Sequence, residues 1–435
     1  MVMKVLIIGA GPAAIVTGEI IKSKKPDAEV KLFTKEKNIF VRCTAPYVIA
    51  GIDPLEKCIT PDDFVTSKGI ELIKEEVTEV HPDENKIVTK FGNEFSYDFL
   101  VFATGARPFV PPIDGSTLKN VFVLRTAEDA KKIKEAVENA QKIVIVGGGM
   151  IGVELASLLS RKKDVTIVEM LPHVMYTAYD EEFCLEAESL LKQNGVKLLL
   201  GKKVEKIIGS EKVEAVQVDG ENIPADVVIL SVGIRANKEL AEKAGIPTGK
   251  FGIKTNEKMQ TSISNIYAVG DCAEAFSAID KKPVPSGLVT TAIMQAKVAA
   301  LNILGEEAQF VGVTNASVTK LFDYSFGRVG FTFEQAKKNG LTVKVGKFEG
   351  LNKYDMQPDT KPLKLKLLFD QDDRIIGGQV FSSGNIVSAL IDFISYAITK
   401  RTKRTELMNF VYSAHPELTP LPFVNPIITA CENVQ

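Results

Sequence analysis

Residues 142–152 read KIVIVGGGMIG, an apolar stretch that runs directly into a turn made of glycines. A second stretch, KVLIIGAGPAA at residues 4–14, repeats this design near the N-terminus. Strands that are apolar along their whole length are typical of a parallel sheet covered by helices on both faces. Each stretch leads into a helical pattern and then another apolar strand, at residues 30–33 and 165–168. Two such strand–helix–strand units predict two Rossmann-like dinucleotide-binding domains in an α/β protein.

Length and charge narrow the class of protein. The chain has 435 residues and a mass of 47.4 kDa, which allows two or three domains. Its 53 Lys and Arg against 55 Asp and Glu leave a net charge of −2, which excludes a nucleic-acid binder that relies on overall positive charge. No run reaches the roughly 18 apolar residues of a membrane span. The five cysteines and three histidines show neither a disulfide framework nor a metal-ligand spacing.

These properties predict a cytoplasmic protein that binds no membrane, nucleic acid or metal, with secretion as the alternative reading of the apolar N-terminus. The last part of the chain differs in character from the rest. Short strands with turn signals, such as residues 364–369 and 374–381, precede an amphipathic helix there. Apolar residues recur at helical spacing in that helix, namely Ile386, Leu390, Ile394 and Ala397. We expect a third, α+β domain over residues 319–435.

The first glycine loop has the form G-x-G-x-x-A, made by Gly9, Gly11 and Ala14. Gly9 allows the tight turn, Gly11 lets the backbone approach a diphosphate, and Ala14 still permits close packing of the helix. The acid expected at the end of the next strand is missing, because Thr34 stands there and Glu36 lies two residues further on. The loop predicts a dinucleotide site, and a strand–helix turn without a ligand is the alternative reading of the loop alone.

The second loop is a full G-x-G-x-x-G, made by Gly147, Gly149 and Gly152. Glu169 ends the following strand, where a carboxylate can accept a hydrogen bond from the ribose 2′-hydroxyl and would repel a 2′-phosphate. This loop therefore predicts a dinucleotide site that favours NADH over NADPH.

Together with the two loops, ATG at residues 103–105 and YAVGD at residues 267–271 resemble the pyridine nucleotide-disulfide oxidoreductases, and the resemblance covers essentially the whole chain. It implies FAD at the first loop, NAD(P)H at the second and a homodimer formed by the last domain. The implied domains are an FAD-binding domain at 1–113 and 247–318, an NAD(P)H-binding domain at 114–246 and a dimerisation domain at 319–435.

The resemblance also assigns further residues to the cofactors. Those expected to bind FAD beside the first loop are Thr34, Arg42, Thr104, Gly105 and Asp271, the last at the ribitol. Glu154 matches a position near the nicotinamide, although a carboxylate on the helix surface would look the same in the sequence.

Residues 40–49, FVRCTAPYVI, narrow the family further. The second cysteine of the glutathione reductase-like enzymes is absent, because Val48 occupies its position. One cysteine followed by x-x-Pro-Tyr resembles the single-cysteine branch, which contains coenzyme A-disulfide reductases, NADH oxidases, NADH peroxidases and sulfur or polysulfide reductases. In that branch Cys43 would be the redox-active sulfur that receives two electrons from the flavin. A helix start near Ala45 and the charge of Arg42 would favour its thiolate.

An inert, buried thiol is the alternative for Cys43, and the other four cysteines are expected to be structural. His415 is the second catalytic candidate, since AHPELT at residues 414–419 resembles the segment in which a histidine serves as acid–base at the other subunit's sulfur. The glutamate partner is not matched, because Pro420 stands there. Tyr412 or Tyr354 could take the role instead, and the implied homodimer places His415 and Tyr412 near the partner subunit's active site.

The resemblance thus implies an FAD-dependent NAD(P)H oxidoreductase that reduces a small disulfide or polysulfide, as a coenzyme A-disulfide reductase does. Two alternatives stay open: an NADH oxidase that reduces oxygen, and a flavoprotein reductase of a small electron-transfer protein. Peroxide reduction is disfavoured, because peroxidase-like members carry a histidine in the first glycine loop where this chain has Pro12.

Overall fold

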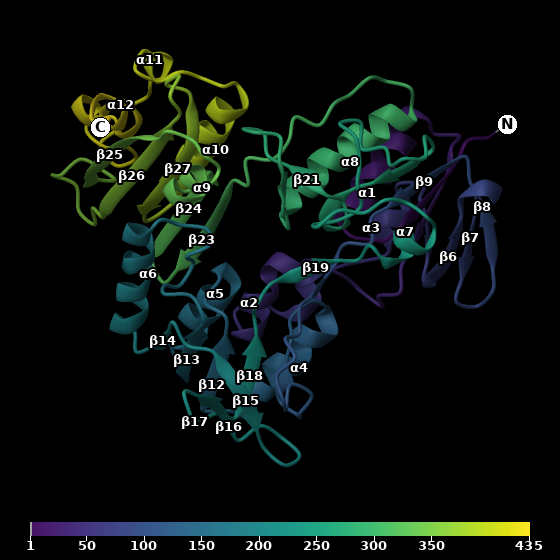
Figure 1. Ribbon diagram of the computed structural model, residues 1–435, viewed down its shortest axis with the longest axis horizontal. Coiled ribbons are helices and arrows are strands. Elements are labelled where there is room, and N and C mark those ends of the chain that lie inside the picture. The colour runs from purple at the N-terminus through teal and green to yellow at the C-terminus, as the bar shows by residue number, and fades with distance from the viewer. Residues whose placement is uncertain (1) are drawn as a thin grey trace. The chain divides into compact units, whose positions relative to one another are not determined.

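The computed structural model describes residues 2–435 (Figure 1). Its contacts group the chain into two compact units. The first unit contains the residues up to Phe109, Leu124–Lys132 and Gly233–Val313, and the second contains Val110–Val123, Ile133–Val232 and Thr314–Gln435. The division falls inside helix α4 (Ala127–Glu138). It leaves the three-domain boundaries given above as a prediction.

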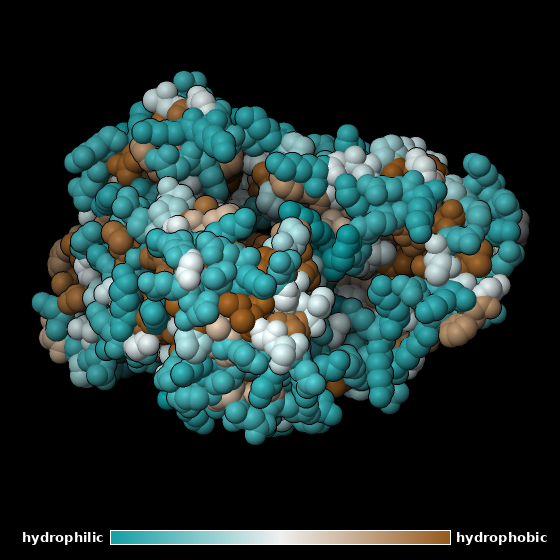
Figure 2. Space-filling view, turned by 60° about the horizontal axis from the view of Figure 1, so that its bottom comes forward, coloured by the Kyte–Doolittle hydropathy of each residue, from teal (hydrophilic) through white to brown (hydrophobic). Residues whose placement is uncertain are grey.

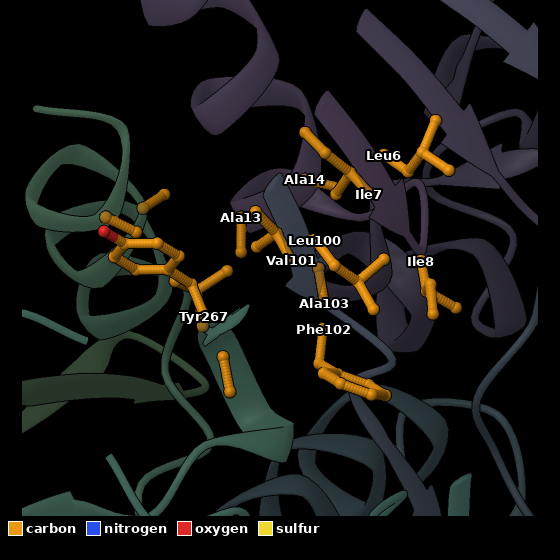
Figure 3. Close-up of a cluster of buried hydrophobic side chains, with 14 of the residues drawn as sticks. Leu6, Ile7, Ile8, Ala13, Ala14, Leu100, Val101, Phe102, Ala103 and Tyr267 are labelled. Carbon is orange, nitrogen blue, oxygen red and sulfur yellow. The ribbon is translucent and has the colours of Figure 1, made fainter. Parts of the chain in front are cut away.

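The first unit is built on a five-stranded parallel sheet in the order β20-β9-β1-β2-β5. Its strands are β1 (Lys4–Ile8), β2 (Glu29–Phe33), β5 (Glu71–Ile73), β9 (Phe99–Phe102) and β20 (Ile266–Ala268). The helices α1 (Pro12–Lys24) and α8 (Val289–Ile303) pack against each other beside it. Figure 3 shows side chains of β1, β9 and the first turn of α1 gathered with Tyr267 of β20 in a buried cluster. The apolar strands expected from the sequence are therefore present and buried.

Smaller elements complete the first unit. They are β3 (Ile39–Phe40), η1 (Arg42–Thr44), α2 (Ala45–Ile49), η2 (Leu55–Cys58), β4 (Ile59–Thr60), α3 (Asp63–Thr66), β6 (Val77–His81), η3 (Pro82–Glu84), β7 (Lys86–Thr89), β8 (Glu94–Ser96), β10 (Ala106–Pro108), β19 (Ile234–Ala236), α7 (Glu239–Lys243), η4 (Gly270–Cys272), β21 (Ala275–Phe276) and β22 (Pro283–Val284). Strands β6, β7 and β8 form an antiparallel sheet, and β10 pairs with β19.

The second unit contains another five-stranded parallel sheet, in the order β11-β18-β12-β13-β14. Its strands are β11 (Val121–Phe122), β12 (Lys142–Val146), β13 (Asp164–Glu169), β14 (Lys197–Leu200) and β18 (Val227–Leu230). Helix α5 (Met150–Leu159) follows β12, and α6 (Glu181–Gln193) follows β13. An antiparallel sheet of β15 (Val204–Ile208), β16 (Ala215–Val218) and β17 (Glu221–Pro224) accompanies them.

The rest of the second unit is an antiparallel sheet in the order β23-β24-β27-β26-β25. Its strands are β23 (Ser317–Leu321), β24 (Tyr324–Gly330), β25 (Lys344–Leu351), β26 (Pro362–Phe369) and β27 (Ile375–Ser382). The accompanying helices are α9 (Phe333–Lys338), α10 (Ile386–Thr399), α11 (Arg404–Leu407), η5 (Pro422–Val424) and α12 (Pro426–Glu432). We refer to these five strands as the C-terminal sheet.

The expected helix is α10, and two of its regularly spaced apolar residues, Ile394 and Ala397, are buried. Val387 and Ile391 are buried in the core, whereas Ile386 and Leu390 are only half-buried. Val387 and Ile391 face β24, because the absence of a side chain at Gly327 of that strand leaves room for them. A helix in which nearly every position is apolar leaves several stripes equally plausible from spacing alone.

The α/β class with two Rossmann-like sheets and an α+β C-terminal part is confirmed. Across residues 2–435, no helix is long and apolar enough to cross a membrane. On the face shown in Figure 2, hydrophobic residues appear as separate groups among hydrophilic ones.

Candidate active site

The first glycine loop joins β1 to α1, and its two glycines have different reasons to lack a side chain. At Gly9 φ is +131°, and a Cβ atom would lie 2.1 Å from the carbonyl oxygen of Ala103. The fold itself therefore requires glycine at this position. At Gly11 the nearest atom to a Cβ would be Arg42 Nη1 at 3.7 Å, an ordinary contact. Because no protein atom demands glycine there, the open space above Gly11 fits a ligand that approaches the backbone.

A cavity of about 590 Å³, which we call the glycine-loop cavity, opens in front of this first loop. The residues predicted to bind FAD line it, namely Gly9, Gly11, Thr34, Arg42, Thr104, Gly105 and Asp271. Ala14 is the exception, since it is fully buried where α1 packs on the sheet. The carboxyl ends of β1, β2, β9 and β20 supply most of these residues, which is where open parallel sheets bind ligands.

An acid that the sequence spacing placed in doubt also lines the cavity. Glu36 accepts hydrogen bonds from Arg42 Nη2 at both carboxylate oxygens, at 2.7 and 2.9 Å. The backbone N–H of Glu36 donates to Thr34 Oγ1 at 3.1 Å, which turns the chain just after β2. Glu36 thus brings to the cavity the carboxylate that Thr34 lacks. In the sequence, a turn directly after β2 would have been the sign that Glu36, two residues beyond the strand end, can reach the cavity.

Arg125 is a cavity residue that the sequence analysis missed. Its guanidinium lies 3.4 Å from the Asp271 carboxylate. Burial lowers the pKa of Arg125, and the nearby charge of Arg42 lowers it further. Arg42 in turn has a buried Nε with no hydrogen-bond partner. Two guanidinium groups that face one cavity fit an anionic occupant such as a dinucleotide diphosphate. No motif surrounds Arg125, so the sequence offered no signal for it.

The turn at residues 103–105 is fixed by Asn237, which also lines the cavity. Thr104 Oγ1 donates to the Asn237 carbonyl at 2.6 Å, and Asn237 Nδ2 donates back to the Thr104 carbonyl at 2.9 Å. The backbone N–H of Asn237 also donates to the Gly105 carbonyl at 2.9 Å. Thr104 and Asn237 therefore hold each other in place at the wall of the cavity.

Cys43 is exposed, in contrast to the other four cysteines, which are all buried. It lies in the 3-10 turn η1, and α2 begins at Ala45 as expected but is only five residues long. The guanidinium of the preceding Arg42 is turned toward Glu36 in the cavity. Burial raises the pKa of the Cys184 and Cys431 thiols to about 12, so neither forms a thiolate near neutral pH.

The second glycine loop joins β12 to α5. As in the first loop, some of its glycines are required by the fold and another leaves open space. A Cβ at Gly147, where φ is +105°, would lie 2.3 Å from the Ser231 carbonyl oxygen. A Cβ at Gly152 would lie 2.1 Å from the Gly147 carbonyl oxygen. Gly149, by contrast, faces open space with no atom within 4 Å of a Cβ. Gly149 therefore leaves room above the start of α5, as a dinucleotide diphosphate requires.

Glu169 lies beside this loop with both carboxylate oxygens fixed. Oε2 accepts the Gly148 backbone N–H at 2.6 Å, and Oε1 accepts the Leu171 N–H at 2.8 Å. The acid is thus oriented at the end of β13, next to the loop. Glu154 is half-buried on α5, in the second turn after the loop.

His415 is exposed, and its Nδ1 accepts the backbone N–H of Glu417 at 3.3 Å. Tyr354 lies next to the loop that contains His415, because its backbone N–H donates to the Pro416 carbonyl at 3.2 Å. The Tyr412 hydroxyl donates to the Pro422 carbonyl at 2.6 Å. Among residues 2–435, His415 forms no ion pair with a carboxylate, in keeping with Pro420 at the position of the missing glutamate.

Two glycine loops after parallel strands and one exposed thiol are features expected of a nucleotide-dependent oxidoreductase. Residues 3–301 match the pyridine nucleotide-disulphide oxidoreductase family, and residues 316–421 match the dimerisation domain of that family. The chain belongs to this family, whose members depend on FAD and NAD(P).

Three of the similar proteins carry names that belong to the branch expected from the single cysteine. An NADH oxidase of Methanocaldococcus jannaschii is 40% identical over 444 residues, covering 99% of this chain and 98% of that protein. An NAD(P)H sulfur oxidoreductase (CoA-dependent) of Pyrococcus abyssi is 37% identical over 385 residues, covering 86% of each. The solved structure of an NAD-dependent persulfide reductase from A. fulgidus has a TM-score of 0.94 at 31% identity, covering 99% of this chain and 82% of that one.

Proposed function

We propose that this protein is an FAD-dependent NADH oxidoreductase that reduces a small disulfide or polysulfide through Cys43. One observation carries the proposal: the single exposed thiol directly follows Arg42, whose guanidinium lines the glycine-loop cavity. Cys43 does not itself line the cavity, so the proposal requires that a cofactor bound there extends past Arg42 to reach the thiol. The CoA-dependent sulfur oxidoreductase and the persulfide reductase described above support the choice of a sulfur acceptor.

The cavity residues would hold FAD by charge and by backbone donors. Gly11 would admit the diphosphate to the start of α1, and the guanidiniums of Arg42 and Arg125 would balance its charge. Glu36, oriented by Arg42, would accept hydrogen bonds from ribose hydroxyls beside Thr34. The remaining predicted contacts are Gly9, Thr104, Gly105 and Asp271. When bound, FAD supplies a two-electron relay between a nicotinamide and a sulfur atom.

The second loop would hold the nicotinamide dinucleotide. Gly147 and Gly152 would maintain the turn, and Gly149 would leave space for the diphosphate. Glu169 would accept the ribose 2′-hydroxyl, which favours NADH over NADPH. Glu154 would lie toward the nicotinamide. In this assignment the FAD-binding domain comprises residues 1–113 and 247–318, the NAD(P)H-binding domain 114–246 and the dimerisation domain 319–435.

Cys43 would act as a nucleophile on the acceptor. Its thiolate attacks one sulfur of a disulfide, the S–S bond breaks, and the first thiolate leaves as a mixed disulfide forms on Cys43. Two electrons that originate from NADH then cleave this mixed disulfide, which restores the Cys43 thiolate and releases the second thiol after it takes up a proton. His415 or Tyr412 would hold or donate that proton.

We infer a homodimer in which the loop around His415 and Tyr412 lies near the partner subunit's active site. Two apolar side chains of that loop, Val411 and Leu418, are 98% and 70% exposed. Both lie within the residues that match the dimerisation domain. Burying each of these side chains against a second copy would stabilise the dimer by roughly 1.5–3 kcal/mol relative to leaving it in solvent.

The direct test is an anaerobic titration of the purified, yellow protein with NADH. We expect loss of the flavin absorption near one equivalent, followed by reoxidation when polysulfide or coenzyme A disulfide is added. A colourless protein that does not take up FAD, or a flavin that NADH leaves oxidised, would contradict the proposal.

Oxygen is the second candidate acceptor, because the M. jannaschii relative with 40% identity is an NADH oxidase. Steady-state rates with air-saturated buffer and with polysulfide, measured at the same NADH concentration, decide between them. A faster rate with polysulfide supports the sulfur acceptor. Turnover that instead requires an added redox protein would favour the electron-carrier alternative.

Coenzyme preference tests the role of Glu169. The wild-type protein should use NADH at least tenfold better than NADPH in kcat/KM. In Glu169→Gln that ratio should fall by about tenfold, or ~1.4 kcal/mol, because the charged acceptor of the ribose hydrogen bond is lost. Asp164→Asn removes the same charge from the other end of β13 and should leave the ratio unchanged. A wild-type preference for NADPH would overturn this assignment.

A further inference from the structure

Residues 169–180 connect the end of β13 to the start of α6, and their first half is attached to the second glycine loop. We call them the 169–180 segment. Besides the bond from Gly148 to Glu169, the backbone N–H of Met175 donates to the Gly148 carbonyl at 2.8 Å. Val174 Cγ1 lies 3.0 Å from the place a Gly148 Cβ would occupy. Both polar groups of the Gly148 backbone are therefore held by this segment.

The other end of the segment is attached to the C-terminal sheet through Asp180. Asp180 Oδ2 accepts from Lys366 Nζ at 2.7 Å and from Gln379 Nε2 at 2.8 Å. Oδ1 accepts the backbone N–H of Phe333 at 2.9 Å, and the Asp180 N–H donates to Gln379 Oε1 at 2.8 Å. The side chains of Asp180 and Lys366 are only 5% and 8% exposed. A buried carboxylate with this many donors is tightly fixed.

The stretch between these two attachments is short and anchored by buried side chains at Met175 and Tyr179. Met175 has φ of +56°, a left-handed conformation, and its side chain is buried. Such a backbone persists in a residue other than glycine only where its surroundings over-determine it. Tyr179 is also buried and packs edge-on against Phe326 of β24, with ring centroids 6.2 Å apart. Only four residues thus separate Met175, which contacts the second glycine loop, from Asp180, and two of them, Ala178 and Tyr179, are buried.

We propose that Asp180 is a positioning residue for NADH, which fixes the 169–180 segment to the C-terminal sheet and thereby holds Gly148 and Glu169 in their binding geometry. The inference rests on the proposed role of the second loop as the NADH site. Asp180 itself lies beyond the loop and acts through the segment. The affinity of the second glycine loop for NADH therefore depends on the C-terminal sheet.

Asp180→Asn tests the proposal with little change of shape. The amide would offer only one acceptor oxygen to a site where a cation and two N–H groups converge, so the segment should loosen. We expect the KM for NADH and the calorimetric Kd for NAD⁺ to rise about tenfold. The value of kcat at saturating NADH and the flavin content should stay within twofold of the wild type.

Lys364→Gln is the matched control. Lys364 lies on the same strand as Lys366 and pairs with Glu186 of α6 at 2.7 Å, so it joins the same strand and helix without touching the segment. We expect its KM and Kd within twofold of the wild type. An equal rise in Lys364→Gln would show a general loosening of α6 and would overturn the proposal, as would an unchanged Kd in folded Asp180→Asn.

If Asp180→Asn does not fold, Lys366→Met replaces it, because Asp180 then keeps Gln379 and Phe333 as partners. A rise in Kd of about threefold supports the proposal, and a value equal to the wild type overturns it. A wild-type protein that binds NAD⁺ but whose flavin NADH does not reduce would overturn the proposed function alone. Failure of the wild type to bind NAD⁺ would overturn both.

Discussion

In Cys43→Ser, NADH-dependent reduction of polysulfide or coenzyme A disulfide should fall by ~1,000-fold or more, while anaerobic reduction of the flavin by NADH continues. A serine hydroxyl neither ionises near neutral pH nor forms a mixed disulfide, so the acceptor half of the cycle is lost. Cys43 is not among the residues that line the glycine-loop cavity, so flavin content should be unchanged. Partly reduced wild type should show a long-wavelength thiolate-to-flavin charge-transfer band that the variant lacks.

Cys58→Ser is the control for this prediction. Cys58 is buried against Phe40, Ala45 and Val48 beneath the same turn, so its loss tests packing without removing the exposed thiol. It should lower the melting temperature and leave the charge-transfer band in place. If the band survives in Cys43→Ser, or if sulfur reduction proceeds there at the wild-type rate, Cys43 is not the redox-active group. Oxygen reduction that persists in Cys43→Ser would show that oxygen does not need the thiol.

The second large effect concerns the two glycines of the first loop. Gly9→Ala should destabilise the fold by about 3 kcal/mol or more, because its Cβ would meet the Ala103 carbonyl oxygen and its φ is strained for alanine. Gly11→Ala should fold with near wild-type stability once flavin is removed, since its Cβ meets only the end of Arg42. It should nevertheless bind FAD at least tenfold more weakly, because the methyl group would occupy the space proposed for the diphosphate.

Thermal unfolding of the flavin-free proteins and fluorescence titration of FAD into each of them separate these effects. If Gly11→Ala binds FAD as tightly as the wild type, the space above Gly11 is not the diphosphate position. If flavin-free Gly9→Ala melts at the wild-type temperature, the loop adjusts more easily than the contact with Ala103 implies.

Local patterns allowed the two parallel sheets to be predicted from the sequence. Continuous apolar runs followed by glycine turns, such as residues 142–152, depend on neighbours in sequence, and their strands and helices are confirmed. Helical spacing alone did not decide which residues of α10 face the core, where Val387 and Ile391 are buried and Ile386 and Leu390 are half-buried. That choice depends on Gly327 of a distant strand, which no helical spacing contains.

The same distinction separates the predicted from the missed residues of the cavity. Gly9, Gly11 and Asp271 belong to motifs with fixed spacing, so their positions follow from short segments. Arg125 reaches the cavity from a segment without any motif, and its partner Asp271 lies 146 residues away. Asp180 likewise contacts Gln379 across 199 residues, so its place in the second unit comes from tertiary packing alone.

The unequal burial of the five thiols also has a practical use. A maleimide probe reacts with thiolates that solvent can reach. Cys43 is exposed and the other four cysteines are buried, so the probe should react at Cys43 alone. A spin label or fluorophore could therefore be attached at position 43 of the unmutated chain, with no cysteine-free background to prepare. Such a reporter would sit one residue from the arginine that lines the glycine-loop cavity, so its spectrum would report loading of the cofactor proposed to bind there.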